Sequence, residues 1–206
     1  MVDIQIRARG VEDARVLAAL AEVPRHRFLD PSQAASAYGD HPLPIGRGQT
    51  ISQPYIVAFM AEALRLEASG RVLEVGSGCG YMAAVLSRLA REVRGIELEP
   101  ALHRQSERVL ADLGIANVRL RCGDGRLGWP EEAPFEAILL SCAAETVPHA
   151  LWEQLAEGGR ILLPLARNPF RQELTLIQRT PAGPVVRSLL PVVFVPLRHP
   201  EAREAQ

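Results

Sequence analysis

The sequence has no lysine, little net charge and few cysteines. Its 23 basic residues are all arginine, which we attribute to the base composition of the genome, and they nearly balance 24 acidic residues. A polyanionic partner would select a clustered basic surface, so we expect no nucleic-acid partner. Three cysteines, Cys79, Cys122 and Cys142, lie far apart and form no CxxC pair. We therefore expect buried thiols in a reducing compartment and neither a disulfide framework nor a metal site.

Long apolar runs are also missing. The first ten residues, MVDIQIRARG, carry charges where a secretory signal needs an apolar stretch, and no apolar run approaches the length of a membrane span. We therefore expect a cytoplasmic protein with no membrane partner. The 206 residues, 48% of them hydrophobic, suffice for one core and are few for two. We expect one domain over residues 1–206, acting as a monomer.

An N-terminal layer, residues 1–70, precedes the regular part of the chain. Apolar residues at helical spacing predict a helix from Glu12 to Val23, which Pro24 ends. The stretch 31–49 is rich in proline and glycine and predicts a long loop, and loops of this length tend to be functional. A second helix is expected from about Ser52 to Ala68. The expected core positions of the two helices are Val16, Leu17, Leu20, Val23, Val57, Met60 and Leu64.

Residues 71–165 alternate between predicted strands and helices. The strands are expected at 71–75, 92–96, 118–122, 135–140 and 160–165, and the helices at 81–90, 100–113 and 148–155. This alternation predicts an α/β fold of the Rossmann-like class, with a mostly parallel sheet and helices on both faces. Residues 166–206 follow with strands expected at 173–178, 185–189 and 192–195 and a frayed tail at 198–206. At least one of these strands must be antiparallel, because the connections are too short for parallel crossovers.

The sharpest local pattern is VLEVGSGCGY at 72–81, an apolar strand that ends in closely spaced glycines before a helix. The glycines Gly76, Gly78 and Gly80 let the backbone turn tightly and approach a ligand without a Cβ in the way. Glu97 stands twenty-one positions beyond Gly76, just after the next predicted strand. A carboxylate there can accept hydrogen bonds from ribose hydroxyls, so the pattern predicts a nucleoside-bearing ligand.

The spacing of the glycines separates two candidate cofactors. A nicotinamide dinucleotide site needs G-x-G-x-x-G to hold a pyrophosphate at a helix N-terminus. Here the spacing is G-x-G-x-G, and Tyr81 stands at the third glycine position of the dinucleotide pattern. Glu74 lies just before the turn, where its charge would repel a pyrophosphate but suits the cationic amino-acid end of S-adenosylmethionine. Asp124, after the third predicted strand, would lie near an adenine amino group.

Each of these residues also has a simpler explanation. A glycine cluster can be a plain turn, Asp124 between two glycines a turn residue, and Glu97 a partner of a helix dipole. Their occurrence in order at three strand ends favours the ligand site, because open α/β sheets bind ligands there. The predicted cofactor-binding residues of this part of the chain are Glu74, Gly76, Ser77, Gly78, Gly80, Glu97, Leu98, Asp124 and Gly125.

Motifs along nearly the whole chain resemble those of the protein-L-isoaspartate O-methyltransferase family. They are VPRHRF at 23–28, YGD at 38–40, LPIGRGQTISQP at 43–54, GDG at 123–125, GWP at 128–130, APF at 133–135, GGR at 158–160 and FVPL at 194–197. The resemblance implies methyl transfer from S-adenosylmethionine to the free carboxylate of L-isoaspartyl residues in damaged proteins and peptides. This is a repair reaction, and its cofactor product is S-adenosylhomocysteine.

The resemblance also implies roles for single residues. Ser52 matches the active-site serine of the family, with Thr50 and Ile51 beside it at the cofactor. The implied substrate-binding residues are Ile45, Gln49, Val195, Pro196 and Leu197. A carboxylate is already ionised at neutral pH, so its attack on a sulfonium methyl needs no general base. We therefore expect Ser52 to donate a hydrogen bond that orients the acceptor carboxylate, and not to act as a nucleophile.

Two positions leave alternatives open. Ser52 stands where the second helix is expected to begin, with Pro54 just inside, so it could instead cap that helix. Glu145 follows the fourth predicted strand where the family commonly has small residues and then proline. A carboxylate in this loop could change the preference for the acceptor or simply point to water.

Three other functions compete with the repair reaction. The first is a carboxyl methyltransferase that acts on aspartates of a dedicated peptide or protein partner. The second is a nicotinamide-dependent oxidoreductase, which the glycine spacing disfavours. The third is a non-catalytic module that keeps the nucleoside pocket.

Overall fold

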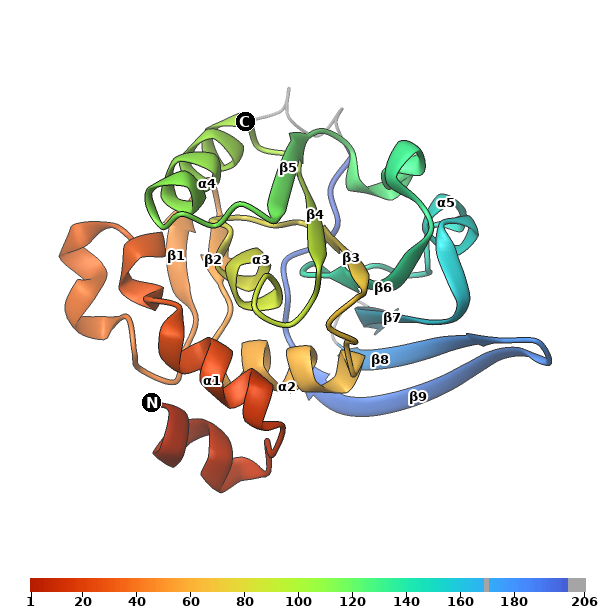
Figure 1. Ribbon diagram of the computed structural model, residues 1–206, viewed down its shortest axis with the longest axis horizontal. Coiled ribbons are helices and arrows are strands. Elements are labelled where there is room, and N and C mark those ends of the chain that lie inside the picture. The colour runs from red at the N-terminus through yellow and green to blue at the C-terminus, as the bar shows by residue number, and fades with distance from the viewer. Residues whose placement is uncertain (169–170, 200–206) are drawn as a thin grey trace.

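The computed structural model describes residues 1–168 and 171–199 and contains a seven-stranded sheet with helices on both faces (Figure 1). The strand order is β5-β4-β3-β6-β7-β8-β9. The strands are β3 (Arg71–Val75), β4 (Glu92–Glu97), β5 (Val118–Cys122), β6 (Phe135–Leu140), β7 (Leu155–Asn168), β8 (Arg171–Thr180) and β9 (Gly183–Val192). Strands β3 to β7 are parallel, whereas β8 and β9 pair antiparallel. The predicted Rossmann-like sheet with antiparallel C-terminal strands is confirmed.

Each face of the sheet carries an apolar layer, because successive side chains of a strand point to opposite sides. Val72 belongs to the core on one face and its neighbour Leu73 to the core on the other. The first core includes residues of α1 (Ala14–Glu22), α2 (Pro54–Leu64), α3 (Tyr81–Leu86) and α4 (Pro100–Asp112), and the second includes residues of α5 (His149–Glu153). Strands covered on both faces appear in sequence as nearly continuous apolar runs. This is why β3 and β6 could be predicted to the residue.

The N-terminal layer is more regular than the sequence predicts. Its short helical turns are Val2–Ile6, Arg7–Arg9, Arg25–Phe28 and Pro31–Ser36. The stretch predicted as a loop also contains an antiparallel hairpin of β1 (Leu43–Gly46) and β2 (Gln49–Ile51). Gly46, Arg47 and Gly48 at its tip all have positive φ values. The glycines that suggested a loop therefore form the tight turn of a hairpin.

Two predicted helices end earlier than expected. Helix α2 ends at Leu64 and not near Ala68, because Arg65 adopts a left-handed conformation with φ of 48°. Helix α3 ends at Leu86, before the predicted end at 90. The expected core positions of α1 and α2 are all buried.

The chain after β9 does not form the strand predicted at 192–195. Val192 is the last residue of β9, and the segment that follows lies instead against the loop after β6. The Ala143 amide donates to the Val195 carbonyl at 2.8 Å, and the Leu197 amide donates to the Ala143 carbonyl at 2.7 Å. These two bonds place the C-terminal segment across the end of β6. Of the tail predicted at 198–206, residues 200–206 lie outside the described part.

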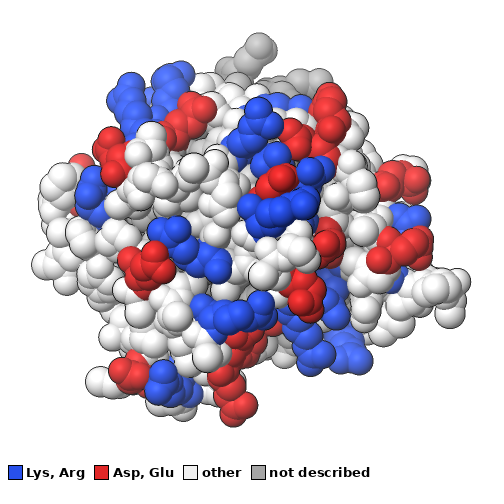
Figure 2. Space-filling view, in the orientation of Figure 1, with Lys and Arg blue, Asp and Glu red and all other residues white. Residues whose placement is uncertain are grey.

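The surface shows no field of one sign in the view of Figure 2, where arginine and acidic side chains are interspersed. Among the described helices, none has the length and apolar character needed to cross a bilayer. Cys79 and Cys142 are buried free thiols as expected. Cys122 is exposed, which corrects the expectation for the third thiol, because it ends the edge strand β5.

Candidate functional site

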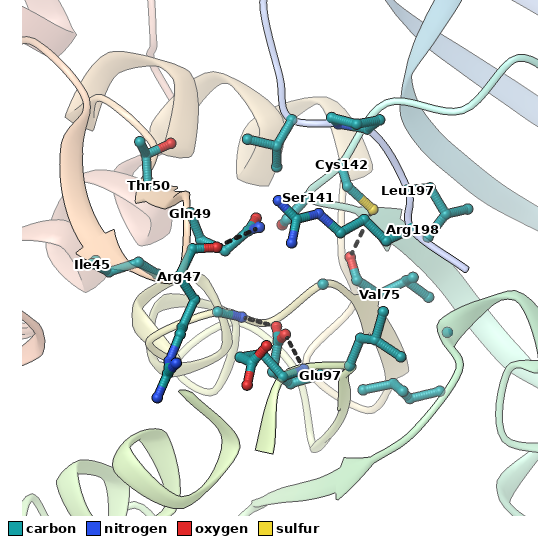
Figure 3. Close-up of a pocket in the computed structure, with 18 of the residues that line it drawn as sticks. Ile45, Arg47, Gln49, Thr50, Val75, Glu97, Ser141, Cys142, Leu197 and Arg198 are labelled. Carbon is teal, nitrogen blue, oxygen red and sulfur yellow. Dashed lines mark hydrogen bonds between the residues drawn. The ribbon is translucent and has the colours of Figure 1, made fainter. Parts of the chain in front are cut away.

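One cavity lies at the carboxyl ends of β3, β4 and β6. We call it the main cavity because it is lined by most of the predicted site residues. From β3 the chain continues to β4 and β5 on one side, and then places β6 on the other side of β3. Open α/β sheets bind ligands at such a reversal of strand order, because a crevice opens outside the strand ends. The cavity has a volume of about 300 Å³ (Figure 3). It is lined by Ile45, Arg47, Gln49, Thr50, Val75, Gly76, Gly78, Ile96, Glu97, Leu98, Glu99, Gly125, Ser141, Cys142, Val195, Pro196, Leu197, Arg198 and His199.

The glycine turn after β3 forms the floor of this cavity. Gly76 and Gly78 have φ values of 80° and 54°, a left-handed region in which residues with a Cβ are strained. A Cβ on Gly76 would lie 3.3 Å from the Cys142 sulfur, so glycine also keeps the turn close to the loop after β6. The Gly76 amide donates to the Ile96 carbonyl at 2.8 Å, which ties the turn to β4.

Glu97 ends β4 and points into the cavity (Figure 3). Its carboxylate accepts hydrogen bonds from the Gly78 amide at 2.7 Å and from the Glu99 amide at 2.8 Å. Burial raises the pKa of Glu97 above its usual range, while these amides act in the opposite direction. Each carboxylate oxygen keeps a further lone pair, so the group can still accept hydrogen bonds from a ligand.

Glu74 is the most deeply buried acid near the cavity, with 1% of its surface exposed. The Ser141 hydroxyl donates to Glu74 Oε1 at 2.9 Å, whereas Glu74 Oε2 has no hydrogen-bond partner among the described residues. Burial raises the pKa of Glu74 to about 8. A buried carboxyl oxygen without a partner is costly, and one that lines a small cavity is available to a cationic ligand group.

Two predicted cofactor residues, Asp124 and Gly80, line neither the main cavity nor the small cavity that contains Glu74. Asp124 instead receives hydrogen bonds from the Arg126 guanidinium, with Nε at 2.9 Å from Oδ1 and Nη2 at 2.6 Å from Oδ2. This contact holds the pKa of Asp124 below its usual range. The Asp124 carboxylate caps the short helical turn after β5, which agrees with the alternative that Asp124 is a turn residue. Gly80 ends the glycine turn and directly precedes α3.

A second cavity, of about 500 Å³, opens on the other side of Thr50 and Ser141. Its lining is mostly apolar and comprises Pro42, Thr50, Ser52, Gln53, Ile56, Ser141, Arg171, Gln172, Pro191, Val192, Val193, Phe194 and Val195. A small third cavity, of about 40 Å³, lies between Glu74, Ser52 and the glycine turn. Thr50 and Ser141 line all three cavities. The three spaces therefore adjoin one another at these two residues.

Ser52 lies at this meeting point and does not cap helix α2. The helix begins at Pro54, with Gln53 at the cap position. The side chain that satisfies its first turn is Asp40, whose Oδ1 accepts the Tyr55 amide at 3.2 Å. Within the described part of the chain the Ser52 hydroxyl has no hydrogen-bond partner, and it lines both smaller spaces. The alternative that Ser52 is a helix cap is therefore wrong.

The structure brings most predicted site residues together and adds others. The main cavity is lined by Ile45, Gln49, Thr50, Gly76, Gly78, Glu97, Leu98, Gly125 and residues 195–197. The small cavity is lined by Ile51, Ser52, Glu74 and Ser77. Sequence reasoning missed Ser141 and Cys142 as lining residues. The signal was present, because both follow a predicted strand whose carboxyl end belongs to the same sheet edge. Their exact place depended on β6 lying next to β3.

The chain matches, over residues 1–202, the family described as protein-L-isoaspartate(D-aspartate) O-methyltransferase. It is 58% identical to protein-L-isoaspartate O-methyltransferase 2 of Anaeromyxobacter sp., over 96% of this chain and 82% of the relative. It is 50% identical to the protein-L-isoaspartate O-methyltransferase of Gloeobacter violaceus, over 99% of this chain and 100% of the relative. A solved structure of a protein-L-isoaspartate O-methyltransferase is similar with a TM-score of 0.89 and 31% identity, covering 97% of this chain and 67% of that one. A Plasmodium falciparum structure described by the same activity, in complex with S-adenosyl-L-homocysteine, has a TM-score of 0.81 and 26% identity, covering 93% and 94%.

Proposed function

The chain belongs to the protein-L-isoaspartate(D-aspartate) O-methyltransferase family, and on that premise we propose which of its residues carry out the family's reaction. The protein is an S-adenosylmethionine-dependent protein carboxyl O-methyltransferase. It transfers a methyl group to the free carboxylate of L-isoaspartyl residues in damaged proteins and peptides. The alternatives of a nicotinamide-dependent oxidoreductase and of a non-catalytic module are set aside by this family membership. A dedicated aspartate partner is not favoured.

The residues around the main cavity fit S-adenosylmethionine. The unpartnered Oε2 of Glu74 suits the α-ammonium group of the cofactor, and Glu97 suits its ribose hydroxyls. The turn at Gly76 and Gly78 leaves room for a ligand because no Cβ projects from it. Bound there, the cofactor supplies the electrophilic methyl group. The further proposed cofactor contacts are Thr50, Ile51, Ser77, Gly80, Leu98, Asp124 and Gly125, with Asp124 also held by Arg126.

The apolar second cavity suits the acceptor peptide. The main cavity is lined by the implied substrate-binding residues Ile45, Gln49 and 195–197, and Val195 also lines the second cavity. We assign to Ser52 a hydrogen bond from its free hydroxyl to the acceptor carboxylate. The carboxylate needs no general base, since it is ionised at neutral pH. The protein then contributes orientation and exclusion of water, and correct placement alone can supply much of the rate acceleration.

One observation carries this assignment of the site. The cavity beside the glycine turn and the cavity beside Ser52 share the side chains of Thr50 and Ser141. A methyl group held in the first cavity would therefore lie next to a carboxylate held in the second. Two cavities separated by a wall of core residues would not permit direct transfer.

A pair of peptides of identical sequence, one with Asp and one with isoAsp, tests the proposed acceptor. Incubation with labelled S-adenosylmethionine is expected to methylate the isoAsp peptide and to leave the Asp peptide near background. The ester should be base-labile, as a carboxyl methyl ester is. Preference for the normal Asp peptide would overturn the repair assignment and would support a dedicated aspartate acceptor.

The class of partner is an isoaspartyl-containing protein or peptide, as the family requires. We further propose that the protein acts as a monomer in the cytoplasm, without a nucleic-acid or membrane partner. Its three free cysteines suit a reducing compartment. The mixed charges of Figure 2 give no clustered basic surface for a polyanion on that face. We also propose that residues 1–206 form one domain, because the cores on both faces draw on the same sheet.

A further inference from the structure

A fully buried arginine lies directly behind Ser52. Arg25, with 0% of its surface exposed, is among the largest completely buried side chains of the protein. Its Nη2 donates to the Ser52 carbonyl at 2.7 Å, and its Nε donates to the Ala37 carbonyl at 2.8 Å. Its guanidinium carbon lies 4.9 Å from the centre of the Tyr81 ring, at the start of α3. Arg25 thus connects the segment that carries Ser52 with the helix that follows the glycine turn.

The charge of Arg25 has no direct counter-charge among the described residues. Asp40 lies close enough to influence the pKa of Arg25, but its carboxylate pairs with Arg9. Within the part of the chain that the structure describes, the Nη1 of Arg25 has no hydrogen-bond partner. Burial lowers the pKa of Arg25, as expected for a cation that loses its water. An apolar side chain of similar size would fill the space at lower cost, because buried charges bear a large desolvation penalty.

The second cavity gives a reason for such a charge. An acceptor carboxylate must leave water to enter a space lined mainly by proline, valine, isoleucine and phenylalanine side chains. Among the described lining residues the one charged side chain is Arg171, which already pairs with Glu173 at 2.6 Å. Removing an anion from water without a nearby cation is unfavourable. Within the described lining, the entering carboxylate therefore meets no cation that is not already paired.

We infer that Arg25 is a positioning residue for the acceptor. It holds the Ser52 segment in place through its hydrogen bond to the Ser52 carbonyl. From the buried side of this segment, its positive charge favours an anionic acceptor over a neutral one. This inference rests on the proposed function of the second cavity. Methyl transfer neutralises the carboxylate and the sulfonium together, so a fixed cation favours binding of the anion more than the chemical step. The charge of Arg25 should therefore appear in acceptor affinity.

The test compares two peptides that differ only in charge. One carries isoAsp, and the other carries the corresponding carboxamide in place of the free carboxylate. Calorimetry in the presence of saturating S-adenosylhomocysteine measures the Kd of each for the wild type, Arg25→Met, Arg25→Gln and Arg25→Lys. The Kd of S-adenosylhomocysteine and the melting temperature report whether each variant keeps its fold. Two neutral variants are used so that a failure of one to fold leaves the other.

The expected result is a loss that depends on the charge of the peptide. The neutral variants should bind the isoAsp peptide about tenfold more weakly, because they lose one buried positive charge, and bind the carboxamide within about threefold of wild type. Arg25→Lys should restore most of the affinity for the isoAsp peptide. Equal loss for both peptides, or no loss for either, would overturn the inference and leave Arg25 a packing residue. If the wild type binds neither peptide, the proposed acceptor cavity fails as well.

Discussion

Replacing Glu74 with glutamine is expected to weaken the binding of S-adenosylhomocysteine roughly 10- to 100-fold, the effect of losing a charged hydrogen bond. The reason is that Glu74 lines the small cavity at the glycine turn, and that its buried Oε2 has no hydrogen-bond partner in residues 1–168 and 171–199. Glutamine keeps the size of the side chain and can still accept the hydrogen bond of Ser141. It cannot supply the charge that a cationic amino-acid group requires. Isothermal calorimetry measures the change.

The same group makes cofactor binding depend on pH. Burial raises the pKa of Glu74 to about 8, so near neutral pH the carboxyl group of the free protein is largely protonated. A cationic ligand favours the ionised form, so binding releases a proton. Wild-type affinity should therefore increase as pH rises toward about 8, by up to tenfold per pH unit. Glu74→Gln should lose this part of the pH dependence while any part due to Glu97 remains.

The stability of the ligand-free protein should decrease as pH rises, whereas its affinity for the cofactor increases. A carboxyl group whose pKa is raised by folding stabilises the protein below its unfolded pKa, and this stabilisation is lost as pH rises through about 8. The ligand-free Glu74→Gln variant should thus melt higher than wild type at about pH 8, by about 3 °C or more, with a smaller difference near pH 5. Glu145→Gln, in the exposed loop after β6, is the control and should change neither quantity. Unchanged ligand affinity in Glu74→Gln would contradict the assignment.

Replacing Ser52 with alanine is expected to lower kcat/KM for an isoAsp peptide roughly 10- to 100-fold, through loss of one hydrogen bond to a charged group. The Ser52 hydroxyl has no partner among the described residues, and helix α2 is capped by Asp40. The substitution should therefore cost little stability, unlike removal of a helix cap, which costs about 1 kcal/mol. Steady-state kinetics and thermal unfolding measure the two effects separately.

The Ser52 experiment needs a control for the substitution itself. Ser69→Ala, in the exposed turn before β3, is expected to match wild type in both measurements. The affinity of Ser52→Ala for S-adenosylhomocysteine should stay within about threefold of wild type, because the hydroxyl is assigned to the acceptor. Wild-type turnover with an unchanged KM would remove Ser52 from the reaction.

The sequence predicts the parts of this site that depend on local chemistry. The glycine turn can be predicted because φ values near 80° at Gly76 favour glycine, and Glu97 because it ends an apolar strand. The parallel order of β3, β4 and β5 follows from the alternation of strands and helices. The glycine turn and each strand are local patterns, and the parallel order needs only the sequence of these elements along the chain.

Other parts depend on contacts between distant segments. Asp40 satisfies the first turn of α2 from across a hairpin, which no spacing rule indicates, so the sequence left open the alternative that Ser52 caps this helix. The C-terminal segment pairs with Ala143 and not with a neighbouring strand, so 192–195 was wrongly predicted as a strand. The contact of Arg126 with Asp124 competes with the expected role of that carboxylate. In the first two cases the outcome depends on packing between segments that are far apart in the sequence, whereas Arg126 and Asp124 are only two residues apart.

A crystal structure with S-adenosylhomocysteine and an isoAsp peptide tests the central claim most directly. The claim is that the two cavities meet at Thr50 and Ser141, so that methyl donor and carboxylate come into line there. We predict the thioether sulfur beside these two side chains, the ligand against the turn at 76–80, and the isoAsp carboxylate within hydrogen-bond reach of the Ser52 hydroxyl. A peptide carboxylate on any other surface, or S-adenosylhomocysteine away from the glycine turn, would contradict the account.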